Sequence, residues 1–214
     1  MKNLWLLAIV IALVSCKNDD ETQDPVQTPD AAGLSYAFVT NSGSFISTYS
    51  DLRSEIQGAQ GVSILAEVNH SSNASGIGEE LRNTRVIFFG NPSQATPLLQ
   101  TNQRAGLDLP QKMVVYDNAD GDTFVAFNSS SYLTARHGLG SSSNLSAIQS
   151  DLTNFAENAT GSAVSSNTVD FGNGQEIVTI NSNNDFNSTY NNLRNAISDN
   201  DNLSIIEEVD HQAN

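Results

Sequence analysis

Basic residues are scarce in this sequence of 214 residues. Nine Lys and Arg stand against 24 Asp and Glu, which gives a formal net charge of −15. Proteins that bind a phosphate backbone need clustered Lys and Arg, and no basic run occurs here. Nucleic acid is therefore excluded as an expected partner. With 38% hydrophobic and 15% charged residues, the composition is still typical of a folded protein.

Cysteine is equally scarce, because Cys16 is the only one, so no intramolecular disulfide can form. No apolar run reaches the about 20 residues that a membrane-spanning helix needs. The longest run, residues 4–14, follows Lys2 and has the layout of a secretory signal peptide. It leads into Leu13-Val14-Ser15-Cys16, which resembles a bacterial lipobox.

The lipobox resemblance implies that residues 1–15 are removed and that Cys16 is acylated. More than one acyl chain gives durable anchoring, so the membrane is an expected partner through Cys16. Residues 16–33 are polar and acidic and predict a flexible tether. Residues 17–21 are similar to an export tag for surface lipoproteins, or they only begin the tether. We therefore expect an outer-membrane or cell-surface lipoprotein that faces the periplasm or the exterior.

An internal repeat follows the tether. Residues 45–73 align with residues 186–214 at an offset of 141, with about thirteen identities over about twenty-nine positions. The repeat predicts a complete module at 34–160, a linker at 161–166 and a truncated second module at 167–214, which would supply only β-α-β. Contacts between modules, or a homodimer, are the expected protein interactions.

The complete module has the pattern of an α+β fold. Alternating or continuous apolar segments predict strands at 34–40, 62–68, 86–89, 113–116 and 124–127. Apolar residues at helical spacing predict one helix that starts at the cap Ser44 and ends at Gly58, and another between the cap Ser143 and Gly161. The order β-α-β-β-β-β-α predicts one mainly antiparallel sheet with helices against one face.

Five segments carry a family resemblance: residues 67–70, 77–92, 95–100, 105–110 and 132–139. Together they resemble the domain of unknown function 302 family over the whole complete module. The resemblance implies a TATA-binding-protein-like β-α-β4-α fold for that module, and it implies no reaction. Asn83, Gln94-Ala95 and Gln111 depart from the family pattern without removing a motif residue.

The connection between the third and fourth strands, residues 91–110, is long for a compact domain. Its polar residues Asn91, Thr96, Gln100 and Asp108 lie among leucines and prolines, which favours a semi-apolar pocket for a small ligand. The alternative is a short helix that packs on the sheet, with Asp108 capping a turn.

Two histidines are further candidates. His70 follows the second strand, and His137 lies near the end of a short helical segment. With Glu80 or Asp108 they would offer imidazole and carboxylate ligands to a metal ion, although their spacing is not that of a compact metal motif. The alternative for each is a structural histidine in a turn. Arg85 is a candidate anion ligand or, alternatively, the partner of a neighbouring acid.

The residues favour a non-catalytic module that binds a small ligand or a partner. No Gly-x-Ser-x-Gly elbow occurs, Cys16 is expected to be acylated, and Lys112 is the only lysine after the tether. No cofactor is predicted. Two alternatives stay open: an enzyme, metal-dependent or not, that uses His70, His137 and nearby carboxylates, and a purely structural surface protein.

Overall fold

Six antiparallel strands form one sheet in the computed structural model, which describes residues 26–40, 43–171 and 177–212. Their order is β2-β3-β4-β5-β1-β6. The strands are β1 (Leu34–Val39), β2 (Ser63–Asn69), β3 (Thr84–Gly90), β4 (Gln111–Asp117), β5 (Thr123–Asn128) and β6 (Ser165–Ser166). The predicted signal peptide and Cys16 lie outside the described residues.

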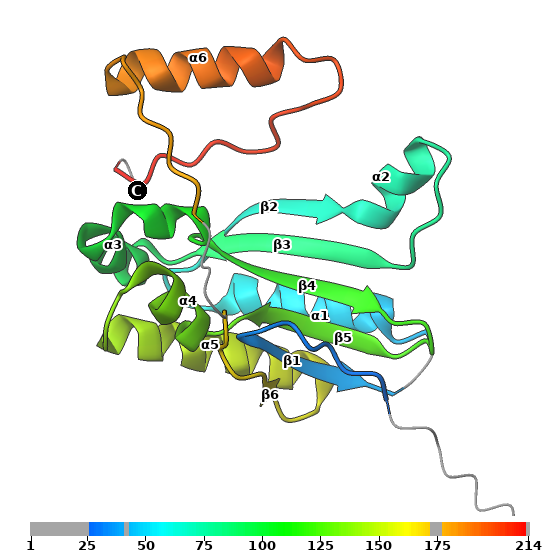
Figure 1. The fold of residues 1–214 in the computed structure, drawn as a ribbon. Helices are drawn as coiled ribbons and strands as arrows, with labels where there is room; N and C mark the ends of the chain where they lie inside the picture. Colours follow the sequence, from blue (N-terminus) through cyan, green and yellow to red (C-terminus); the bar gives the residue numbers. More distant parts are fainter. Residues whose placement is uncertain (1–25, 41–42, 172–176, 213–214) are drawn as a thin grey trace, which may run out of the picture.

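Two long helices, α1 (Phe45–Gly58) and α5 (Ser143–Thr160), cover one face of this sheet (Figure 1). Leu52 and Ile56 of α1 lose all solvent exposure, because they pack against side chains of the central strands such as Val115. The stripes of apolar residues at helical spacing thus form the core, as the sequence predicts. The α+β fold with one mainly antiparallel sheet is confirmed.

The caps of the two helices differ in detail from the expectation. The Ser44 hydroxyl donates to the Thr123 hydroxyl over 2.8 Å and makes no cap bond to α1. Ser142, one residue before the predicted Ser143, caps α5 by accepting from the Asn144 amide. Gly161 ends α5 in the left-handed conformation at φ 68°, as expected for a helix C-terminus.

The connection from Asn91 to Pro110 is helical. Its backbone therefore follows the second of the two expectations, a short helix, and not an irregular loop. It consists of α3 (Pro92–Thr101) and the 3₁₀ helix η1 (Gln103–Leu107), and α3 packs against α5. Asn91 caps α3 by accepting from the Ser93 amide, and Pro92 lies in the first turn, where its missing N–H costs nothing. Two further short helices are α2 (His70–Gly76) and α4 (Ser130–His137).

Residues 167–212 differ from the predicted β-α-β. The helix is present as α6 (Phe186–Ser198), and Asp185 caps it by accepting from the Ser188 amide. The two strands expected around it, at 177–180 and 205–209, are not formed. A strand needs a hydrogen-bonded neighbour to satisfy its backbone groups, and neither segment pairs with a strand of the described sheet.

The predicted linker at 161–166 also needs correction, because part of it joins the sheet. Ser165 and Ser166 form β6, which pairs with Tyr36 and Ser35 of β1. The Ser35 and Ser166 hydroxyls share a hydrogen bond of 2.7 Å. Within the described residues, no helix has the length and apolar character to cross a bilayer.

Candidate functional site

One end of the sheet gathers several of the predicted site residues. Strands β3 and β5 run antiparallel to β2 and β4, so the chain leaves β3 and β5 at the end where it enters β4. Asn91 follows β3, Asp108 precedes β4, and His137 lies in the helix after β5. His70 follows β2 and therefore lies at the opposite end.

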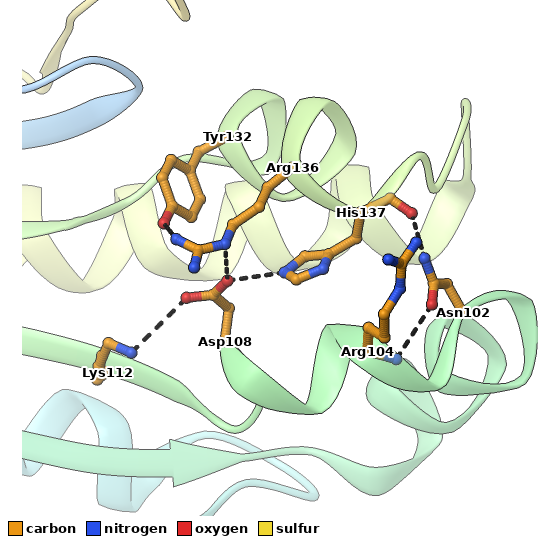
Figure 2. A network of polar contacts seen from close by, with 7 residues as sticks. All are labelled: Asn102, Arg104, Asp108, Lys112, Tyr132, Arg136 and His137. Atoms are coloured by element: carbon orange, nitrogen blue, oxygen red, sulfur yellow. Dashed lines mark hydrogen bonds and ion pairs between the residues drawn. The ribbon is translucent and has the colours of Figure 1, made fainter. Parts of the chain in front are cut away.

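Asp108 and His137 form the most buried polar contact at this end (Figure 2). His137 Nε2 lies 2.7 Å from Asp108 Oδ2. Asp108 is the residue at which η1 ends, and His137 is the last residue of α4, which Gly138 terminates at φ 62°. Two segments that lie 29 residues apart in sequence are thereby joined inside the protein.

Two cations share the carboxylate of Asp108. Arg136 Nε lies 3.3 Å from Oδ2, and Lys112 Nζ lies 3.8 Å from Oδ1. Arg136 also donates to the Tyr132 hydroxyl one turn earlier in α4. The carboxylate is only 6% exposed, while Lys112 and Arg136 are 40% and 30% exposed. The charge of Asp108 is therefore buried beneath two partly exposed cations, an arrangement that offsets the cost of its desolvation.

Asn102 adds a second connection between the same two segments. Its side-chain nitrogen donates to the His137 carbonyl over 2.7 Å, and its oxygen accepts from the Arg104 amide over 3.1 Å (Figure 2). The first bond satisfies a carbonyl at the end of α4, and the second caps η1. Asn102, Asp108 and His137 together fix η1 against α4.

The chemistry available to His137 is limited by its burial. Its side chain has no solvent exposure, and its Nδ1 atom has no hydrogen-bond partner. A general acid or base must reach a substrate within about 3 Å, directly or through a water. This geometry suits a histidine that holds two segments together.

A cavity of about 90 Å³ lies at the same end of the sheet, between α3, the start of β2 and the chain near its C-terminus. Asn91 and Thr96 line it, as do Leu65 and Leu99, and its wall is mostly apolar. Val209 and His211 close one side. The residue that sequence reasoning missed here is His211, although the repeat pairs it with His70.

A second set of contacts joins α1 to the edge strand β2. The Tyr49 hydroxyl donates to Glu67 Oε2 over 2.5 Å, and Arg53 Nε donates to Glu67 Oε1 over 2.9 Å. The rings of Phe45 and Tyr49 stack with centroids 6.3 Å apart. We call these four residues (Phe45, Tyr49, Arg53 and Glu67) the α1 cluster.

Arg85 of β3 covers the α1 cluster. Its guanidinium carbon lies 5.0 Å from the ring centroid of Tyr49 and 5.7 Å from that of Phe45. This distance is within the range of a cation–π contact. Arg85 thus contacts two aromatic rings, and its Nε atom is buried without a hydrogen-bond partner.

These contacts shift two pKa values in opposite directions. Burial raises the pKa of the Tyr49 hydroxyl, and the hydrogen bond to Glu67 raises it further. Burial also acts to raise the pKa of Glu67, but the hydrogen bonds from Tyr49 and Arg53, with the charges of Arg53 and Arg85, outweigh it. The pKa of Glu67 is therefore lowered from its ordinary value of 4.5.

The same contacts recur 141 residues later. The Tyr190 hydroxyl and Arg194 Nε both donate to Glu208 Oε1 over 2.8 Å. The Phe186 and Tyr190 rings stack with centroids 6.1 Å apart and planes 15° apart, against 16° for Phe45 and Tyr49. We call these residues (Phe186, Tyr190, Arg194 and Glu208) the α6 cluster. The shared Phe, Tyr, Arg and Glu of the repeat are the signal that could have identified both clusters from sequence.

The other predicted site residues lie apart. His70 begins α2, Glu80 is exposed in the connection before β3, and Gln100 is exposed on α3. The metal-site alternative would need His70 and His137 close together, and the two lie at opposite ends of the sheet. Across the described ranges, no group of three or more His, Cys, Asp or Glu is arranged to hold a metal ion.

A family model described as "Domain of unknown function DUF302" matches residues 37–159, which is more than half of the chain. The chain belongs to the DUF302 family. The matched range runs from within β1 to the last turn of α5, so the Asp108–His137 network lies inside the DUF302 module.

A solved structure has the same fold. The uncharacterised conserved protein DUF302 from Bacillus stearothermophilus aligns with a TM-score of 0.51 and 18% identity, over 60% of this chain and 99% of that chain. Two curated relatives named "Fluoride-specific ion channel FluC 1", from Brucella suis and Brucella abortus, are 33% identical over 87 residues, which is 41% of this chain. The match spans about a third of the length of these relatives, 34% and 32% respectively.

Proposed function

We propose that this DUF302 protein is a lipid-anchored component of the cell envelope whose module binds a small ligand without catalysis. The observation that carries the proposal is the cavity beside α3, where Asn91 and Thr96 sit among apolar side chains. This is the mixture that small-molecule sites use, with apolar walls for affinity and a few polar groups for orientation.

The size of the cavity indicates the class of ligand. Drug-sized sites measure about 300–1,000 Å³, whereas an apolar cavity of about 150 Å³ holds a benzene molecule. At about 90 Å³, this cavity suits an aliphatic group of three to five carbons, with a polar end near Asn91 or Thr96. Short-chain alcohols and carboxylic acids have this form.

A non-catalytic role is supported by the burial of His137. The ring would need an accessible nitrogen to exchange a proton with a ligand, and its side chain has no exposure. The Asp108–His137 pair instead holds the end of η1, which follows α3, and α3 forms one wall of the cavity.

The test is a series of straight-chain alcohols and carboxylic acids from two to eight carbons, followed by NMR shifts and by melting temperature. We expect saturable binding with an optimum at three to five carbons, and loss of binding in Ala95→Leu, which fills the cavity. Gln100→Ala, an exposed change on the same helix, is the control. The site would be rejected if no ligand binds, or if the affinity depends neither on the number of carbons in the ligand nor on Ala95→Leu.

The membrane anchor is a separate part of the proposal and rests on the lipobox resemblance at Cys16. The Brucella relatives named ion channels carry a matching segment inside a longer chain, which supports a module that works beside a membrane. Labelling cells with radioactive palmitate tests the anchor. We expect label in the wild-type protein and none in Cys16→Ser, which should also leave the membrane fraction.

A further inference from the structure

The α1 and α6 clusters have the same ring stacking and similarly exposed Arg–Glu pairs, but their aromatic rings differ in exposure. Phe45 and Tyr49 are 2% and 8% exposed, whereas Phe186 and Tyr190 are 80% and 43% exposed. No side chain of α6 is buried. Within the described residues, nothing therefore covers the rings of the α6 cluster as β3 covers those of the α1 cluster.

What covers the α1 cluster is the strand β3. In the β2–β3 pair, Asn69 lies opposite Arg85 and Glu67 lies opposite Ile87. Ile87 and Phe89 are buried on the helix side of the sheet. The cover thus consists of an extended segment with an arginine, followed at every second position by apolar residues.

The α6 cluster lacks that arginine. Among the described residues, cation–π contacts occur only at Phe45, Tyr49 and Tyr132, so no cation lies over Phe186 or Tyr190. Leu193, the counterpart of the fully buried Leu52, is 60% exposed.

The charge around the α6 cluster complements an arginine. Residues 199–210 contain five acids (Asp199, Asp201, Glu207, Glu208 and Asp210) and no Lys or Arg. A second copy of this surface would bring like charges together, which disfavours pairing between two α6 clusters. A cationic segment is attracted to the same surface.

We propose that the α6 cluster, with Leu193, binds an arginine-bearing extended polypeptide segment. The guanidinium lies over the Phe186 and Tyr190 rings as Arg85 lies over Phe45 and Tyr49. The apolar residues at alternate positions cover Leu193, and the segment pairs with the chain at 205–209 as β3 pairs with β2. Adding a strand in this way is a common mode of peptide recognition.

The experiment uses the full chain in detergent and a fluorescent peptide that copies residues 83–90, extended by a polar tail. Anisotropy measures its binding. The matched control peptide carries citrulline, a neutral isostere of arginine, in place of Arg85. We expect saturable binding of the arginine peptide, and binding about tenfold weaker for the citrulline peptide, because it loses the cation–π contact.

Two variants locate the site on the protein. Tyr190→Ala should lower the affinity for the arginine peptide about tenfold. The melting temperature of the protein should stay unchanged, because Tyr190 is outside the core. Arg82→Ala, an exposed change in the DUF302 module, is the control and should bind as the wild type does. Equal affinity for the two peptides, unchanged binding by Tyr190→Ala, or a homodimer that Tyr190→Ala dissociates would each overturn the proposal. The alcohol-binding test of the cavity is independent of all three results.

Discussion

At the residue scale, the environment of a side chain decides what its chemistry is used for. Asp108 and His137 have the residue types of an acid–base pair, and they lie 2.7 Å apart. Because neither side chain is more than 6% exposed, the pair contributes its hydrogen bond to the fold. Removing this contact should therefore lower the free energy of unfolding of the protein.

The first prediction is that His137→Ala lowers the free energy of unfolding by about 3 kcal/mol. The change leaves a cavity and removes one partner of a buried carboxylate, and both effects destabilise by amounts of this order. Urea denaturation followed by circular dichroism measures the loss. His70→Ala is the matched control, since it changes an exposed histidine and should leave the midpoint unchanged. Equal midpoints for the two variants would show that the Asp108–His137 contact carries no stability.

The second prediction concerns pH. The lowered pKa of Glu67 means that the folded state favours its ionised form. This stabilisation is present above the ordinary pKa of 4.5 and is lost as pH falls through the lower folded value. Glu67→Gln should therefore reduce the fall in melting temperature between pH 6 and pH 3.

Glu208→Gln is the control for this pH effect. The pKa of Glu208 is also lowered, chiefly by the hydrogen bond from Tyr190, but α6 has no buried residue. Its titration should leave the melting temperature of the DUF302 module unchanged. If the fall in melting temperature between pH 6 and pH 3 became smaller in Glu208→Gln but not in Glu67→Gln, the effect would come from Glu208 and the prediction would be wrong.

At the scale of elements, local pattern predicted those helices and strands whose neighbours are present. The stripe from Tyr49 to Ile56 gave α1, and the alternation from Ile64 to Val68 gave β2. The segment 205–209 has a similar sequence to β2 and forms no strand, because it is not hydrogen-bonded to any described strand. Strand formation depends on a partner, which periodicity alone does not report.

The candidate site was less accessible to sequence reasoning. Asp108 and His137 were each singled out, but their contact joins residues 29 positions apart and depends on the direction of β4 and β5. Pro97 lies inside α3, where both it and Ser93 are exposed. Water can then satisfy the Ser93 carbonyl that the proline leaves without a donor.

The third prediction compares equivalent leucines in α1 and α6. Leu52→Ala should lower the free energy of unfolding by about 3 kcal/mol, because Leu52 is fully buried in the core. Leu193→Ala should change it by less than about 0.5 kcal/mol, because Leu193 is 60% exposed. Urea denaturation of both variants measures the difference. Similar losses would mean that α6 is packed in solution as α1 is.

At the scale of the whole molecule, the chain combines a packed module with a region that has little core. The DUF302 module has two helices against an antiparallel sheet, and its central side chains have no exposure. The part from 177 to 212 contributes one helix without buried residues and touches the module at the cavity through Val209 and His211. Local stability should differ accordingly, because amides with few buried contacts open without global unfolding.

The fourth prediction is that amides of α6 exchange with deuterium on the order of 100-fold or more faster than those of α1. The two helices share much of their sequence and the same Phe-Tyr stacking, so the comparison isolates tertiary packing from helix propensity. A helix of 13 residues is marginal in water without such packing. Exchange measured by mass spectrometry on peptides from 45–58 and 186–198 of one sample gives both rates together. Equal protection of the two helices would show that α6 is covered in solution, and its partner would then have to be sought within the same sample.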